Sequence, residues 1–119
     1  MIQGANCGVD VQEQRRYKRV VFREPYQLAT RKGELLGASL TFDLSAGGIR
    51  LRTDEFLPVG SLVSIQFSCC NNQLLTIQGK VAWVQKVPHA DSYQAGLQFD
   101  ENEENLFFLS EIRKFVKKG

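Results

Sequence analysis

Residues 43–48, with the sequence DLSAGG, interrupt a pattern that is otherwise typical of β-strands. Apolar residues alternate with small or polar ones up to Phe42, and the alternation resumes at Gly48. These residues fit a turn, because Asp and Ser bond nearby backbone amides and Gly accepts positive φ. They equally fit a ligand site: Asp43 can accept from guanine N1–H and N2–H₂, Ser45 adds a hydroxyl, and Gly48 lets a ring approach the backbone. Composition alone does not separate the two interpretations.

A basic cluster precedes the first long strand-like segment. In residues 14–20, QRRYKRV, Arg15 and Arg19 lie four positions apart with Arg16 and Lys18 between them. A guanidinium offers a planar pair of donors that matches a phosphate or the O6/N7 edge of guanine. A solvated, charged lead-in to a strand is the alternative interpretation. The two motifs suit opposite edges of the same base, so their occurrence together favours binding of a purine nucleotide.

Positive charge is concentrated near the start of the chain. Seven basic residues and one acidic residue lie between Arg15 and Lys32, although the formal net charge of the whole chain is only +2. A local cationic patch on a nearly neutral protein favours a compact anion over a long polyanion, so we do not expect nucleic acid as a partner. A barrel that binds oligonucleotides through basic and aromatic residues is the competing hypothesis.

The cysteines and the histidine do not form a pattern typical of catalysis or metal binding. Cys7, Cys69 and Cys70 lack C-x-x-C spacing, and His89 is the one histidine. Zinc normally takes its ligands in spaced pairs, and no serine is marked as a partner for a histidine in a predicted loop. We therefore expect no enzyme, no metal and no cofactor, and we interpret the cysteines as small apolar residues in a reducing compartment.

The composition, 43% hydrophobic and 24% charged over 119 residues, is typical of one globular domain. No apolar run reaches the roughly 18–20 residues that a membrane span needs, so direct insertion into a membrane is not expected. The N-terminus lacks the basic start and apolar stretch of a secretion signal, which favours a cytoplasmic location.

Six segments with strand-like alternation are followed by one with helical spacing. The predicted strands are residues 25–31, 35–42, 48–53, 62–69, 74–86 and 93–100. Gly79 is expected to mark a bend or bulge in the long fifth strand. Six short strands most simply close into a barrel, which gives an all-β fold with a C-terminal helix over an open end.

The predicted helix covers residues 102–118. Its apolar face is expected to consist of Leu106, Leu109, Ile112 and Val116. Asp100 or Asn102 can cap the N-terminus, and acidic residues in the first turn and basic residues in the last suit the helix dipole.

Together, these features resemble the PilZ domain family. R-x-x-x-R (Arg15, Arg19) precedes D-x-S-x-x-G (Asp43, Ser45, Gly48), as in that family, in a chain whose strands fit its six-stranded antiparallel split β-barrel with a C-terminal helix. The late segments VAWVQK and YQAGLQF also resemble the closing strands of the family. The resemblance predicts a flexible segment at 1–13 and a PilZ-like domain at 14–118, with the barrel at about 20–100.

The resemblance implies a bacterial receptor for the second messenger cyclic di-GMP. Arg15 and Arg19 would grip guanine edges and phosphates from a mobile N-terminal loop, with Arg16 and Lys18 as auxiliary phosphate partners. Asp43 and Ser45 would hydrogen-bond a guanine on the barrel surface, which Gly48 keeps flat.

Two further residues matter in the family. Trp83 occupies a position where some relatives place an aromatic residue near the ligand, and a core tryptophan is the alternative interpretation. Gln14 precedes the first motif arginine, where the residue type influences whether one ligand or a stacked pair binds; glutamine leaves the stoichiometry open.

The resemblance also implies an output. Ligand binding would change the conformation of the arginine loop and signal to a partner protein of the motility, exopolysaccharide or transcription machinery. A ligand-independent adaptor, which keeps the barrel and acts through protein contacts alone, is the alternative.

Overall fold

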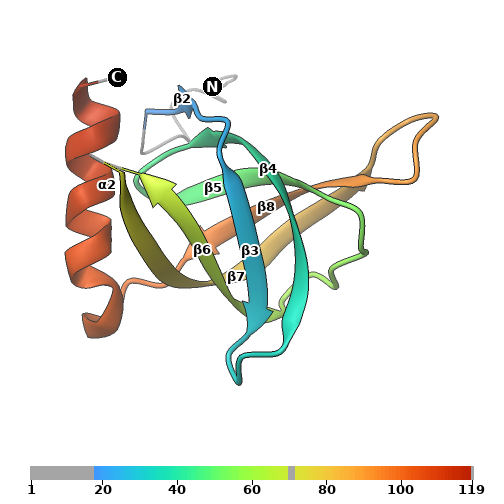
Figure 1. The fold of residues 1–119 in the computed structure, drawn as a ribbon, viewed down its shortest axis with the longest axis horizontal. Helices are drawn as coiled ribbons and strands as arrows, with labels where there is room; N and C mark the ends of the chain where they lie inside the picture. Colours follow the sequence, from blue (N-terminus) through green and yellow to red (C-terminus); the bar gives the residue numbers. More distant parts are fainter. Residues whose placement is uncertain (1–17, 70–71, 119) are drawn as a thin grey trace, which may run out of the picture.

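The computed structural model describes residues 18–69 and 72–118. The strands are β2 (Val20–Val21), β3 (Pro25–Thr30), β4 (Leu35–Leu44), β5 (Gly48–Thr53), β6 (Leu62–Cys69), β7 (Gln73–Lys86) and β8 (Tyr93–Phe99). A 3₁₀ turn, η1 (Glu103–Asn105), leads into the helix α2 (Leu106–Lys118), as Figure 1 shows. Residues 1–13, predicted as a flexible segment, lie outside the described residues.

The strands form one antiparallel sheet in the order β2-β4-β3-β6-β7-β8-β5, and an additional β4–β5 pairing closes it. The predicted fold class, a six-stranded antiparallel barrel with a C-terminal helix, is thus confirmed (Figure 1). The short strand β2 was not predicted. It pairs Val20 with Leu44 and Val21 with Asp43, beyond the part of β4 that pairs with β3, and two residues are too few to give a periodic signal.

Alternate side chains of the strands fill the barrel. In β6, Val63, Ile65 and Phe67 are buried while the residues between them are half-buried, as the alternation predicts. Other fully buried side chains from the strands complete this core: Leu28, Leu44, Ile49, Leu51, Leu75, Ile77 and Val81.

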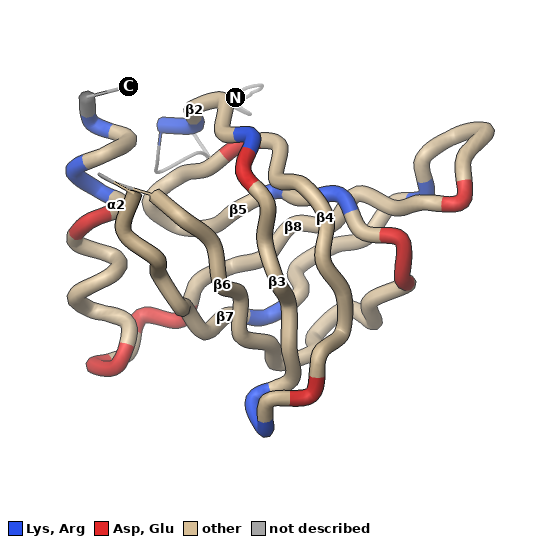
Figure 2. The backbone as a smooth tube through the Cα atoms, in the orientation of Figure 1, with Lys and Arg blue, Asp and Glu red and all other residues tan. Residues whose placement is uncertain are grey.

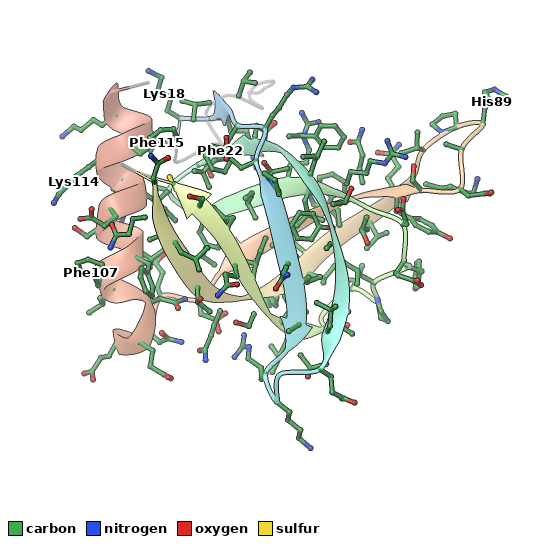
Figure 3. All side chains as sticks on the ribbon, viewed as in Figure 1. Lys18, Phe22, His89, Phe107, Lys114 and Phe115 are labelled. Atoms are coloured by element: carbon green, nitrogen blue, oxygen red, sulfur yellow. The ribbon has the colours of Figure 1, made fainter. Side chains whose placement is uncertain are left out.

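Aromatic side chains join the helix to one end of the barrel. The ring of Phe22 lies 5.6 Å from that of Phe67 and 5.7 Å from that of Phe115, both edge to face. Figure 3 shows Phe22 and Phe115 at the same end of the barrel. Phe22 therefore connects the barrel interior to α2. Within residues 18–69 and 72–118, no helix has the length and apolar character needed to cross a membrane.

The start of the helix is fixed by two asparagines. Asn102 caps it, as predicted, by accepting from the Asn105 amide. The Asn105 side chain is buried; it donates to the carbonyls of Gln78 (2.8 Å) and Asp100 (2.7 Å) and accepts from the Gln78 amide. Asn105 thereby takes the inward position that was predicted for Leu106, which is 54% exposed.

The glycine in β7 has a different role from the predicted one. The register shift in this strand lies between Val81 and Trp83, and Gly79 pairs regularly with Val63 and Phe99. A Cβ at Gly79 would lie 2.6 Å from the carbonyl oxygen of Gln98. The position therefore needs glycine because two strands approach closely there, and the bulge occurs later in the strand.

A buried tyrosine predicts how stability responds to alkaline pH. Tyr26 is 2% exposed and its hydroxyl donates to the Arg52 carbonyl across the barrel. Burial raises the pKa of Tyr26 from 10.0 to about 12. The neutral phenol thus contributes stability below pH 10, and this contribution is lost as the pH rises toward 12.

We expect the free energy of unfolding, measured by urea titration, to fall across this pH range in the wild type and to fall less in Tyr26→Phe. Tyr93→Phe, at a more exposed tyrosine, is the control and should retain the wild-type profile. An unchanged slope in Tyr26→Phe would contradict the assignment.

Candidate functional site

An acidic side chain bridged by two arginines lies on the barrel surface at the end of β4. Asp43 Oδ1 accepts from Arg19 Nη1 at 2.7 Å, and Asp43 Oδ2 lies 2.7 Å from Arg50 Nη2. The Asp43 side chain is 14% exposed, so it depends on these partners more than a surface carboxylate would. One residue from each of the two predicted motifs, Arg19 and Asp43, is therefore in direct contact.

A bulge in β4 positions this carboxylate. The register shifts between Thr41 and Asp43, so that Thr41 pairs with Leu51 and Asp43 with Arg50. The extra residue, Phe42, lies under the Arg50 guanidinium, whose carbon is 5.4 Å from the ring centroid. Phe42, Asp43 and Arg50 thus form one surface cluster.

Arg50 and Phe42 were not predicted as site residues from the sequence. The available signal was strand alternation: Arg50 lies between buried Ile49 and Leu51, so its side chain must point outward. The bulge that brings Phe42 to the same surface has no comparable signal in the sequence. The Arg50 Nε is buried, and no hydrogen-bond partner for it occurs among the described residues.

Ser45 lies in the predicted turn but does not share the outward direction of Asp43. It is 4% exposed, and its Oγ accepts from the amides of Gly47 (3.3 Å) and Gly48 (3.2 Å). Strand β4 ends at Leu44, so strand alternation does not place Ser45 on the same face as Asp43. In this structure the hydroxyl shapes the turn, and contact between Ser45 and a ligand stays a prediction.

Gly48 is required by packing against β8, and its role in keeping a ligand surface flat stays a prediction. It pairs with Gln98, and a Cβ there would collide with the Leu97 carbonyl of β8. Any side chain at this position would push β5 away from β8. Substitution of Gly48 would therefore reduce stability whether or not a ligand binds, which makes it a poor test of binding.

Trp83 lies on the outer surface, 37% exposed, and the alternative of a core tryptophan is wrong. Its indole covers Gly96, where a Cβ would collide with the ring. The strand registers pair Asp43 with Arg50, Arg50 with Gly96, and Gly96 with Trp83. Asp43, Arg50 and Trp83 consequently lie in one row across β4, β5, β8 and β7.

The basic residues do not form one patch. Arg31 and Lys32 belong to the β3–β4 turn, which Figure 2 shows at the end of the barrel opposite β2. Arg31 has a structural role there: its guanidinium donates hydrogen bonds to the carbonyls of Val63 and Gly79 and forms an ion pair with Asp100 at 2.8 Å. Arg31 and Lys32 were not predicted as site residues. The predicted site residues Arg15 and Arg16 lie outside the described residues, as does Gln14.

The described motif residues line neither of two surface clefts, of about 360 and 680 Å³, that other described residues form. The β7–β8 loop carries His89 at its tip (Figure 3). Over residues 18–69 and 72–118, no three His, Cys, Asp or Glu side chains are grouped to hold a metal ion.

Comparison with known proteins identifies the family. The model of the PilZ domain matches residues 13–118, and the chain belongs to the PilZ domain family. No sequence among the curated proteins matches the chain.

Solved structures share the fold at low sequence identity. The Bacillus subtilis inhibitor of motility MotI/DgrA superposes with a TM-score of 0.73 at 15% identity, over 87% of this chain and 50% of that one. The PilZ domain of YcgR from Escherichia coli with c-di-GMP gives 0.64 at 15% identity, over 88% and 93%. The K. pneumonia MrkH–c-di-GMP complex gives 0.64 at 24% identity, over 87% and 51%. The chain thus spans about half the length of MotI/DgrA and MrkH.

The contact between Trp83 and Gly96 predicts a fluorescence change. In Gly96→Ala the new methyl group would displace the indole, and the lost packing should cost about 1 kcal/mol of unfolding free energy. Because Trp83 is the one tryptophan, its emission should shift to longer wavelength as the ring becomes hydrated.

Gly37→Ala is the matched control. A Cβ at Gly37, also in a strand, meets its nearest neighbour, Thr53 Oγ1, at an ordinary 3.8 Å. This variant should leave the emission unchanged. An unshifted spectrum in Gly96→Ala would show that the indole does not lie on Gly96.

Proposed function

We propose that this chain is a receptor for cyclic di-GMP that binds the nucleotide on the outer surface around Asp43. The observation that carries the proposal is the 2.7 Å ion pair between Arg19 and Asp43, which joins the two family motifs across 24 positions of sequence. Solved PilZ proteins with c-di-GMP, YcgR and MrkH, share the fold and support the choice of ligand.

The charge and hydrogen-bonding capacity of the cluster suit a guanine nucleotide. Two guanidinium groups face one carboxylate, which leaves a local positive charge for a phosphate. Each carboxylate oxygen can accept two hydrogen bonds, so Asp43 can accept from guanine N1–H and N2–H₂ while an arginine stays bound. Trp83, in the same row, offers an aromatic surface near the ligand.

The segment before β2 supplies the rest of the site in this proposal. Arg15 and Arg19 contact guanine edges and phosphates, and Arg16 and Lys18 add contacts to phosphate. Binding draws this segment onto the barrel around Asp43, and the resulting change in shape and charge is recognised by a partner protein. The motility, exopolysaccharide and transcription machineries are the candidate partners.

A ligand-independent adaptor is the second candidate, and one observation favours it. The Ser45 hydroxyl is buried and bonded within its turn, so the second motif has a structural use without any ligand. An adaptor of this kind would show no binding of cyclic di-GMP at high micromolar concentration.

Loss of either motif residue should weaken binding. Arg19→Ala and Asp43→Ala each remove contacts worth roughly 1–3 kcal/mol, so the dissociation constant for cyclic di-GMP should rise about 5- to 150-fold in titration calorimetry. The affinity of the wild type should also fall as the salt concentration rises, because phosphate contacts contribute to it.

Arg23→Ala is the matched control for Arg19. Arg23 is an exposed arginine four positions further along; it lines the 360 Å³ cleft, to which Asp43 does not belong. Its removal subtracts the same charge and should leave the affinity within about twofold of wild type. Equal affinities in Arg19→Ala, Asp43→Ala and wild type would remove the proposed site.

A further inference from the structure

Asp43 is bound by two arginines that differ in how firmly they are held. Arg50 is part of β5, which pairs with β4 on one side and β8 on the other, and its neighbours Ile49 and Leu51 are buried. Arg19 precedes β2 and belongs to no strand. The Arg50 side chain is further restrained by the ring of Phe42. The two ion pairs are equally short, but only the Arg50 pair is built into the barrel.

We infer that Arg50 is a positioning residue for nucleotide recognition: it holds the Asp43 carboxylate in the orientation that reads the N1–H and N2–H₂ edge of guanine. The inference rests on the proposed function and assigns selectivity to a residue outside both family motifs. Arg50 stays on Oδ2 when the nucleotide binds, whereas Arg19 leaves Oδ1 to the base and turns to phosphate. Arg50 thus acts through Asp43.

A carboxylate needs such a restraint to distinguish guanine from similar bases. Guanine presents two adjacent donors, and both reach one carboxylate only when its plane is aligned with the base. Hypoxanthine, the base of inosine, keeps N1–H but lacks the N2 amino group. A fixed carboxylate gains the additional N2–H₂ bond from guanine, whereas a rotating one gains little of it.

The experiment compares two ligands on paired variants. Titration calorimetry is performed with cyclic di-GMP and with cyclic di-inosine monophosphate on wild type, Arg50→Gln and Arg52→Gln. Arg52 is the matched control because it lies two residues along the same strand, and its carboxylate contact, to Asp54, is 3.9 Å long.

The wild type should prefer cyclic di-GMP by about tenfold or more, as expected for a hydrogen bond to a charged acceptor. Arg50→Gln should lose about tenfold in affinity for cyclic di-GMP and less for the inosine analogue, so that the preference narrows to about threefold or below. Arg52→Gln should keep the wild-type preference.

A double-mutant cycle tests whether Arg50 acts through Asp43. In an Asp43→Asn background, Arg50→Gln should change the affinity for cyclic di-GMP by less than about twofold. Arg50→Lys keeps the positive charge but lacks the planar guanidinium, so it should fold like the wild type and still show the narrowed preference for cyclic di-GMP over the inosine analogue. It replaces Arg50→Gln if thermal melting shows that Arg50→Gln is unfolded.

The outcomes are distinct. Equal losses of affinity for the two ligands would show that Arg50 attracts phosphate in general, and they would overturn the positioning role. Additive effects of Arg50→Gln and Asp43→Asn in the double-mutant cycle would also overturn it. A preference unchanged in both Arg50 variants would overturn it while the proposed function survives. Failure of the wild type to bind cyclic di-GMP would overturn the proposed function and this inference together.

Discussion

The antiparallel ladder between β4 and β5 closes the barrel, and it also positions Asp43 and Arg50 on the surface. Its register pairs Asp43 with Arg50, and its bulge places Phe42 beside them. Closure also requires β5 to lie against β8, where Gly48 leaves no room for a side chain. The residues that close the barrel therefore also position the surface cluster of Phe42, Asp43 and Arg50.

One short segment connects this cluster to the helix. Arg19 contacts Asp43, the adjoining β2 pairs with the end of β4, and Phe22 packs between the barrel and Phe115 of α2. Any displacement of Arg19 acts on a segment whose other end is anchored in the core. Under the proposed function, a ligand that moves Arg19 would act on the segment whose Phe22 packs against α2.

Periodicity in the sequence was sufficient to predict the barrel strands and the helix, because alternation and helical spacing follow from which side chains face the core. It could not predict Asn105 as an inward residue, since the backbone groups that satisfy it come from β7 and the segment before η1. The same limit applies to the site. Asp43 and Arg19 belong to local motifs, whereas the role of Arg50 depends on a cross-strand register that a one-residue bulge shifts.

The burial of Asp43 constrains how a nucleotide can bind under the proposed function. A carboxylate that is 14% exposed would be costly without a partner, and in this structure Arg19 and Arg50 meet that need. A guanine that replaces Arg19 exchanges one set of charged hydrogen bonds for another, so the loss of the ion pair offsets part of the free energy gained from the base contacts. The released Arg19 and its neighbours add further free energy at the phosphates. Recognition of the base is thereby assigned to the barrel, and part of the affinity to the segment before it.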